Sequence, residues 1–125
     1  MMAEMIVSIL LAIRAVESSG GMDPRAEGND LQITRVCIED VNRILAKRNS
    51  TVRYSTADAK DLRKSHEIAV IYLTYWVEFI RRNDRSARAK DVREVAARIW
   101  HRGPRNWKDS MGAIYWAKVR RHLDD

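Results

Sequence analysis

Glu17 has the sequence context of a carboxyl group that can act as a general acid. It closes the apolar segment 5–16 and is followed at once by Ser18, Ser19 and two glycines. A helix of this apolarity carries its last side chains toward the interior, and the glycines then turn the backbone into a loop. Burial disfavours the charged form of a carboxyl group, so such a residue can donate a proton near neutral pH. The alternative interpretation is an ordinary glutamate at an exposed helix C-terminus.

The hydrophobic pattern predicts an all-α protein of about five helices around a buried central helix, with little or no β-structure. Helical spacing of apolar residues predicts helices over about 3–17, 35–47, 58–82, 88–101 and 109–123. Residues 18–33 are too rich in Gly, Asp, Asn and Pro to form an element. The segment 68–77 is apolar nearly all round, which places the third helix in the middle of the domain. Thr51–Tyr54 is a short strand candidate.

The composition predicts a single folded domain over residues 1–125. Hydrophobic residues make up 46% and charged residues 32% of the chain, which is typical of a globular protein with one core. The single Cys37 excludes an internal disulfide and a zinc site built on several cysteines. We expect it to be buried, because it shares a helical face with Val41 and Leu45. His66-Glu67 has no second histidine four residues on, so we expect no metal site there.

The chain is basic, with a net charge of +6 and a pI of about 9.8. This balance predicts attraction to polyanions such as nucleic acid, anionic lipid or cell wall, but it does not choose among them. The basic residues are interspersed with Asp and Glu, so the sequence shows no continuous phosphate-binding stripe. Glu4 stands where a signal peptide would be basic, and we expect no signal peptide in this chain. The apolar run 68–80 contains Glu78 and is too short to span a bilayer.

Three segments follow one another in an order that is typical of one family. They are Glu17-Ser18-Ser19-Gly20 with Asp23-Pro24 after it, the segment 28–33 with Asp30 and Gln32, and the segment 97–104 with Trp100 and His101. Over residues 5–120 the chain resembles the soluble lytic transglycosylases and the goose-type lysozymes that share their fold. In that family a Glu-Ser pair at a helix end supplies the catalytic acid, a following turn lines the cleft, and a late Trp/Tyr-Asn-x-Gly element closes the opposite wall. This chain departs from the pattern at His101, where the family has Asn, at Arg102, and at Asp30, where the family has a small residue.

The resemblance implies cleavage of the β-1,4 bond between N-acetylmuramic acid and N-acetylglucosamine in peptidoglycan. Glu17 would protonate the bridging oxygen while the N-acetyl group of the substrate stabilises the cationic centre. Glu17 would then accept the proton of the sugar's own 6-hydroxyl, which closes an anhydro ring without water. If Asp23 or Asp30 instead holds a water on the opposite face, the outcome is inverting hydrolysis. Neither route implies a cofactor or a metal.

The predicted substrate-binding residues are Ser18, Gln32, Tyr72, Tyr75, Trp100 and His101. The amide of Gln32 suits the hydroxyl and acetamido groups of a sugar, or else it braces the loop against the next helix. His101 can donate a hydrogen bond to substrate, or cap the last carbonyls of its helix. Trp100 lies on the apolar stripe of its helix, which favours a core position with one edge in the cleft. The family implies that one tyrosine of the central helix, Tyr72 or Tyr75, reaches the cleft.

The leading hypothesis is therefore a peptidoglycan-cleaving enzyme, either a phage endolysin or an enzyme of wall remodelling. We expect it to act on the cell wall, in the periplasm or outside the cell, after phage delivery or removal of a leader. Its expected partner is the glycan strand, bound by a monomer without stable membrane insertion and without nucleic acid. The alternative is a non-catalytic basic helical domain that binds nucleic acid or a cell-wall polymer. A third hypothesis is a lysozyme-like module without activity, for which His101 in place of Asn is the argument.

Overall fold

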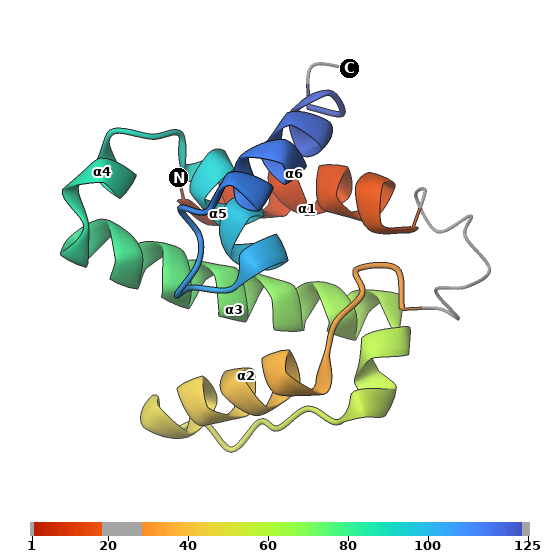
Figure 1. Ribbon diagram of the computed structural model, residues 1–125. Helices are drawn as coiled ribbons and strands as arrows, with labels where there is room; N and C mark the ends of the chain where they lie inside the picture. The colour runs from red at the N-terminus through yellow and green to blue at the C-terminus, as the bar shows by residue number, and fades with distance from the viewer. Residues whose placement is uncertain (1, 19–28, 124–125) are drawn as a thin grey trace.

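The computed structural model describes residues 2–18 and 29–123, and all regular secondary structure in this part of the chain is helical (Figure 1). The elements in chain order are α1 (Met2–Ser18), α2 (Arg35–Lys47), the 3-10 helix η3 (Thr56–Lys60), α3 (Leu62–Asn83), α4 (Arg85–Arg88), α5 (Val92–Arg102) and α6 (Ser110–Arg120). The described residues form no strand, which confirms the predicted all-α class. The predicted third helix, 58–82, is divided into η3 and α3, and the predicted fourth, 88–101, begins later, at Val92.

Side-chain caps explain where several helices begin. The hydroxyl oxygen of Thr34 accepts a hydrogen bond from the backbone N–H of Cys37 at 3.2 Å, and this fixes the start of α2. Helices α3, α5 and α6 each begin after a capping aspartate, whose carboxylate accepts a hydrogen bond from a backbone N–H of the first turn. These aspartates are Asp61, Asp91 and Asp109, in that order. An aspartate at this position also interacts favourably with the partial positive charge of the helix N-terminus. The divided third helix follows from this rule, because Asp61 starts a new helix inside the predicted one.

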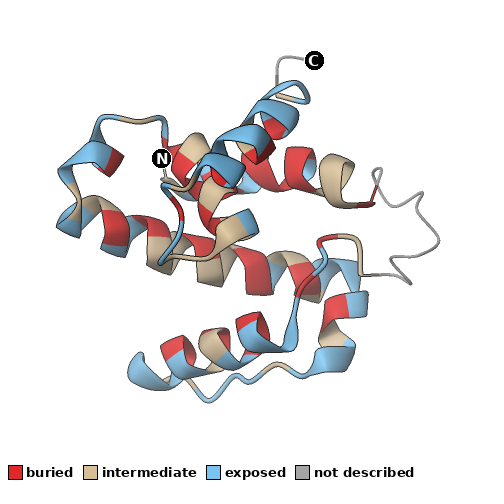
Figure 2. Ribbon diagram, viewed as in Figure 1, coloured by how far each residue is buried: buried red, intermediate tan, exposed pale blue. Residues whose placement is uncertain are grey.

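Helix α3 is the centre of the fold and contacts α1, α2, η3, α4 and α5. Figure 1 shows α2 on one side of α3 and α1 and α5 on the other. The side chains of Ile68, Leu73 and Val77 on α3 are completely buried. Figure 2 shows buried segments in red along α3. Burying one such side chain contributes roughly 1.5–3 kcal/mol. No helix of the described residues is long and apolar enough to cross a membrane.

One face of α3 is covered only in part. Tyr75 and Trp76 are half-buried, and Phe79 keeps 41% of its surface exposed. These side chains line a cavity between α2 and the segment after α5. Helix α2 covers α3 only in part, since it is much shorter than α3. An apolar sequence therefore marks both the core face of α3 and the wall of a cavity.

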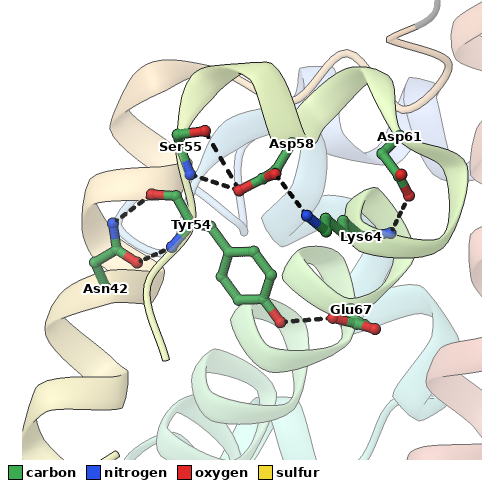
Figure 3. Close-up of polar contacts among 7 residues, drawn as sticks. All are labelled: Asn42, Tyr54, Ser55, Asp58, Asp61, Lys64 and Glu67. Carbon is green, nitrogen blue, oxygen red and sulfur yellow. Dashed lines mark hydrogen bonds and ion pairs between the residues drawn. The ribbon is translucent and has the colours of Figure 1, made fainter. Parts of the chain in front are cut away.

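The connection between α2 and α3 is held by side chains rather than by a strand partner (Figure 3). The amide of Asn42 donates to the backbone carbonyl of Tyr54 and accepts from its N–H, both at 2.9 Å. The Tyr54 hydroxyl donates to Glu67 at 2.8 Å, and Asp58 accepts from the N–H of Ser55. The candidate strand 51–54 is irregular for this reason, because Asn42 satisfies the polar groups of its last residue without a ladder.

An ion pair anchors the segment that follows the undescribed residues 19–28. The Arg14 guanidinium on α1 contacts the Asp30 carboxylate through two nitrogens, each at 2.8 Å. Leu31 and Ile33 enter the core, and Asn29 hydrogen-bonds both backbone polar groups of Ile33 at 2.9 Å. Segment 29–34 is thus fixed at the end of α1, although it is not itself helical.

His66 gives this region a pH-dependent stability. Burial, and next the charge of Arg14, lower the pKa of half-buried His66, while Asp30 raises it. The unfolded chain binds the proton more readily, so the free energy of unfolding falls as the pH drops through the ordinary histidine pKa of about 6.5. We expect His66→Gln to flatten this dependence between about pH 7 and pH 5 in urea denaturation. The exposed His122→Gln is the matched control, and equal slopes for wild type and His66→Gln would contradict the assignment.

Candidate functional site

Five of the predicted site residues line one cavity of about 260 Å³. They are Glu17, Gln32, Tyr72, Trp100 and His101, and Ile33, Thr34, Val36 and Cys37 complete the wall. These residues come from the end of α1, the segment before α2, the first turn of α2, the middle of α3 and the end of α5. The fold therefore brings all three motif segments to a single place. This cavity is called the acid cavity below.

Glu17 is held by a buried tyrosine from the other end of the chain. The hydroxyl of Tyr115 on α6 donates a hydrogen bond to Oε1 of Glu17 at 2.8 Å. Burial, and next the negative charge of Glu17 and this hydrogen bond, raise the pKa of Tyr115 far above its ordinary value. The hydroxyl consequently stays protonated and acts as a fixed donor. Within the described part of the chain, Oε2 of Glu17 has no hydrogen-bond partner.

His101 stacks on Tyr115 on the side of the acid cavity. The two rings are nearly parallel, at an angle of 4°, and their centroids lie 4.3 Å apart. His101 is exposed, whereas Tyr115 is only 5% exposed, so the imidazole covers the tyrosine ring. The stack restrains the ring that positions Glu17 and leaves the imidazole at the cavity wall. Hydrogen bonding from His101 to substrate stays a prediction.

Gln32 adopts a left-handed backbone conformation, with φ of 57°. This conformation costs about 1 kcal/mol for a residue with a Cβ atom and persists only where neighbours enforce it. Asn29 supplies that constraint, because its carbonyl accepts the N–H of Gln32 and its amide holds Ile33. The side chain of Gln32 is exposed at the acid cavity and makes no hydrogen bond to another described residue. Asn29, and not the side chain of Gln32, therefore holds this segment in place.

Trp100 and Tyr72 form the wall between the acid cavity and the core. The Trp100 indole N–H donates to the backbone carbonyl of Leu31 at 3.2 Å. Tyr72 meets Trp100 edge-on, with centroids 6.0 Å apart, and both side chains are half-buried. Trp100 therefore has the predicted core position with part of its surface in the cavity. Cys37 is buried as expected, and burial raises the pKa of its thiol to about 12, which leaves the thiol unreactive.

Three other predicted residues are not presented to the acid cavity. Asp30 is occupied by its ion pair with Arg14 and is not among the residues lining the acid cavity. Ser18 is fully buried, and its hydroxyl donates to the Arg14 carbonyl at 3.1 Å, so it stabilises the helix end instead of binding substrate. Tyr75 lines the neighbouring cavity on the other side of Tyr72. Asp23, the remaining candidate, lies outside the described residues.

Sequence reasoning missed Tyr115. Its position on the apolar stripe of α6 is typical of a core residue, and 98 positions separate it from Glu17. The one available signal is chemical: a buried tyrosine hydroxyl needs a polar partner, and a carboxylate at a helix end is such a partner. That signal shows that a partner exists, but it does not say which one.

Comparison of the chain with protein-family models, with curated proteins and with solved structures found no match. The function is therefore argued from the geometry of the site. Among the described residues, no three His, Cys, Asp or Glu side chains are grouped so that they could hold a metal ion. What the acid cavity offers is one carboxyl group with a fixed donor, an exposed amide, an exposed imidazole and two aromatic walls.

The strain at Gln32 is directly testable. We expect Gln32→Gly to be more stable than Gln32→Ala by about 1 kcal/mol, because glycine adopts a positive φ without steric cost whereas alanine does not. Both changes remove the same amide, so the comparison isolates the backbone term. The free energy of unfolding in urea is the measurement. Equal stabilities for the two variants would show that residue 32 carries no strain.

Proposed function

We propose that this protein cleaves the β-1,4 glycosidic bond between N-acetylmuramic acid and N-acetylglucosamine in peptidoglycan, with Glu17 as the catalytic acid. The observation that carries the proposal is the hydrogen bond from Tyr115 to Glu17 at the wall of the acid cavity. It orients a carboxyl group whose second oxygen has no partner among the described residues. Proton transfer to a leaving oxygen requires such a positioned group within hydrogen-bond reach.

In the first step Oε2 of Glu17 donates its proton to the bridging oxygen as the bond to the anomeric carbon breaks. The electron pair of that bond leaves with the oxygen, and positive charge develops at the anomeric carbon. Glu17 becomes a carboxylate in the same step. Tyr115 then stabilises the new negative charge, because a hydrogen bond to a charged acceptor is stronger than one to a neutral group. The fixed donor therefore assists the step that creates the charge.

The second step is proposed to use a group of the substrate in place of a second protein carboxylate. Of the two candidate carboxylates, Asp30 is the one that the structure describes, and the Arg14 guanidinium already occupies it. The acetamido oxygen of the substrate can stabilise the anomeric centre, as in substrate-assisted glycosidases. Glu17 then accepts the proton of the 6-hydroxyl, whose oxygen closes the anhydro ring. This lytic transglycosylase route consumes no water, and ordinary hydrolysis with Asp23 as the base is its competitor.

The remaining side chains of the acid cavity suit an N-acetylated sugar. The amide of Gln32 can donate to and accept from the acetamido group and the hydroxyls. Tyr72 and Trp100 supply apolar surface for a sugar face, and His101 offers a ring nitrogen from the opposite side. The proposed setting is the cell wall, as a phage endolysin or an enzyme of wall remodelling. The net charge of +6 favours retention on an anionic wall.

The first test is Glu17→Gln. Glutamine keeps an oxygen that accepts the Tyr115 hydrogen bond but cannot donate a proton as an acid, so we expect an intact fold and at least a hundredfold slower release of muropeptides, about the scale of acid catalysis. Purified peptidoglycan is incubated with each protein, and the released fragments are weighed by mass spectrometry. Fragments lighter by one water than the hydrolytic products indicate the anhydro route, and ordinary reducing ends indicate hydrolysis.

Asp30→Asn is the matched control, since it changes a carboxylate to an amide beside the acid cavity without touching Glu17. We expect Asp30→Asn to have a lower free energy of unfolding than wild type but to release the same type of fragment from peptidoglycan. Full activity of Glu17→Gln, or no release by wild type, would refute the proposal. The non-catalytic alternative would gain support if the inactive wild type bound DNA in a strongly salt-dependent way.

The second test removes the fixed donor. Tyr115→Phe keeps the ring that stacks on His101 and deletes the hydrogen bond to Glu17. We expect kcat to fall about tenfold, because the acid is less well positioned, and the unfolding free energy to fall by about 1–2 kcal/mol. The matched control is Tyr54→Phe, which deletes a tyrosine–glutamate hydrogen bond of the same length outside the acid cavity. If both variants keep the wild-type kcat, Tyr115 has only a structural role.

A further inference from the structure

A second cavity of about 770 Å³ adjoins the acid cavity and shares Val36 and Tyr72 with it. It lies between α2, the exposed face of α3, and the end of α5 with the segment 103–106 that follows it. The volume of this second cavity is that of an ordinary ligand pocket, whereas the acid cavity alone is below that size. The larger one is called the basic arm below.

The floor of the basic arm is aromatic. Tyr75 and Trp76 meet edge-on with centroids 5.0 Å apart, and Phe79 stacks on Tyr75 at 6.4 Å. The Trp76 indole N–H donates to Asp40 at 2.6 Å, which fixes the ring against α2. A fixed aromatic cluster gives a ligand apolar contact at a low entropic cost, because its side chains are already ordered. It suits the apolar faces of sugar rings.

The rim of the basic arm is cationic. Arg43 and Lys47 project from α2, and Arg102 and Arg105 come from the opposite wall, against the single carboxylate of Asp40. Arg43 pairs with Asp40 at 3.1 Å and Arg102 pairs with Asp109 at 2.9 Å. Among the described residues, no carboxylate lies within ion-pair distance of Lys47 or Arg105, and the Lys47 ammonium lies 6.0 Å from the Tyr75 ring centroid. Two cations are thus available to an anionic ligand on opposite walls.

We propose that the basic arm binds the part of the glycan strand that carries carboxylates, with sugar faces on the aromatic floor and carboxylates at Lys47 and Arg105. The proposal rests on the proposed function, because it takes the strand to continue from the acid cavity. Carboxylates on a peptidoglycan strand have two sources. One is the stem peptide, and the other is the lactyl group of a muramic acid without a stem peptide, because an attached peptide is joined to the lactyl carboxyl through an amide bond. A neutral strand such as a chitin oligomer has neither. The basic arm would therefore distinguish an anionic glycan from a neutral one of equal length.

The test compares binding and turnover on four glycans: native strands, strands freed of stem peptides by an amidase, strands whose carboxylates are converted to amides, and a chitin oligomer. The variant is Lys47→Gln with Arg105→Gln, which leaves no described carboxylate without its ion-pair partner. The matched control is Lys118→Gln with Arg121→Gln, the same charge change on exposed positions outside both cavities. Binding is measured with the Glu17→Gln background so that the strand stays intact.

In the Glu17→Gln background with Lys47 and Arg105 unchanged, we expect native strands to bind about fivefold more tightly than amidated strands, a difference that high salt removes. The Lys47/Arg105 variant should lose this preference and show a raised KM without a change in kcat, while the control pair keeps it. The amidase replaces the carboxylates of the stem peptide by a freed lactyl carboxylate. Weak binding of the amidase-treated strands assigns the contact to the stem peptide, and binding as tight as that of native strands shows that a lactyl carboxylate is sufficient. Equal binding of native and amidated strands by the Glu17→Gln protein with Lys47 and Arg105 unchanged overturns the inference.

The outcome separates this inference from the proposed function. If wild type cleaves native and amidated strands equally well, cleavage stands and the basic arm has no role in recognition. If wild type cleaves nothing but prefers native strands through Lys47 and Arg105, cleavage fails and the inference stands. Tighter, salt-sensitive binding of a single-stranded oligonucleotide than of native strands would assign the aromatic floor and cationic rim to nucleic acid, and would overturn the inference.

Discussion

The burial of α5 is the constraint on which the candidate site depends. Val95, Ala96, Ala97 and Ile99 have no exposed surface, and α5 contacts α1, α3 and α6. The small residues of α5 and Gly112 on α6 allow close approach, because a Cβ atom at Gly112 would lie 3.3 Å from the side chain of Arg98 and 3.5 Å from that of Arg102, both on α5. This packing places α6 beside the end of α1, and so the last turn of α5 and the buried face of α6 meet at the same carboxyl group.

The fold also brings together basic residues that lie far apart in the sequence. Basic residues are interspersed with acidic ones along the chain, so no cationic stripe is evident from the sequence. In the structure Lys47 and Arg105 face one cavity from two elements, while several acidic residues are occupied as caps or ion-pair partners elsewhere. The sequence therefore does not reveal that these cations lie beside the aromatic side chains of the basic arm.

Helix positions and the motif residues were predictable because they depend on local rules. The 3.6-residue period locates the helices, and the order of the three motif segments predicts that Glu17, Gln32 and His101 line one cleft, as they do. Contacts between distant segments were not predictable in the same way. The hydrogen bond between Tyr115 and Glu17 leaves no periodic pattern in the sequence, and neither does the ion pair between Arg14 and Asp30. Tyr75 shows the limit most clearly, because an aromatic residue on an apolar helix face fits a core and a cavity wall equally well.

Glu17 and the basic arm are held in place by different elements of the fold. Glu17 depends on α1 and on Tyr115 of α6, whereas the basic arm depends on α2, α3 and the segment after α5. Of the residues that the structure describes, only Val36 and Tyr72 belong to both cavities, and the edge-on contact of Tyr72 with Trp100 fixes the wall where they meet. Changes in ligand preference along the arm therefore need not disturb the proton donor. A strand that crosses Tyr72 would have its recognised part and its reacting bond held by independent elements of one core.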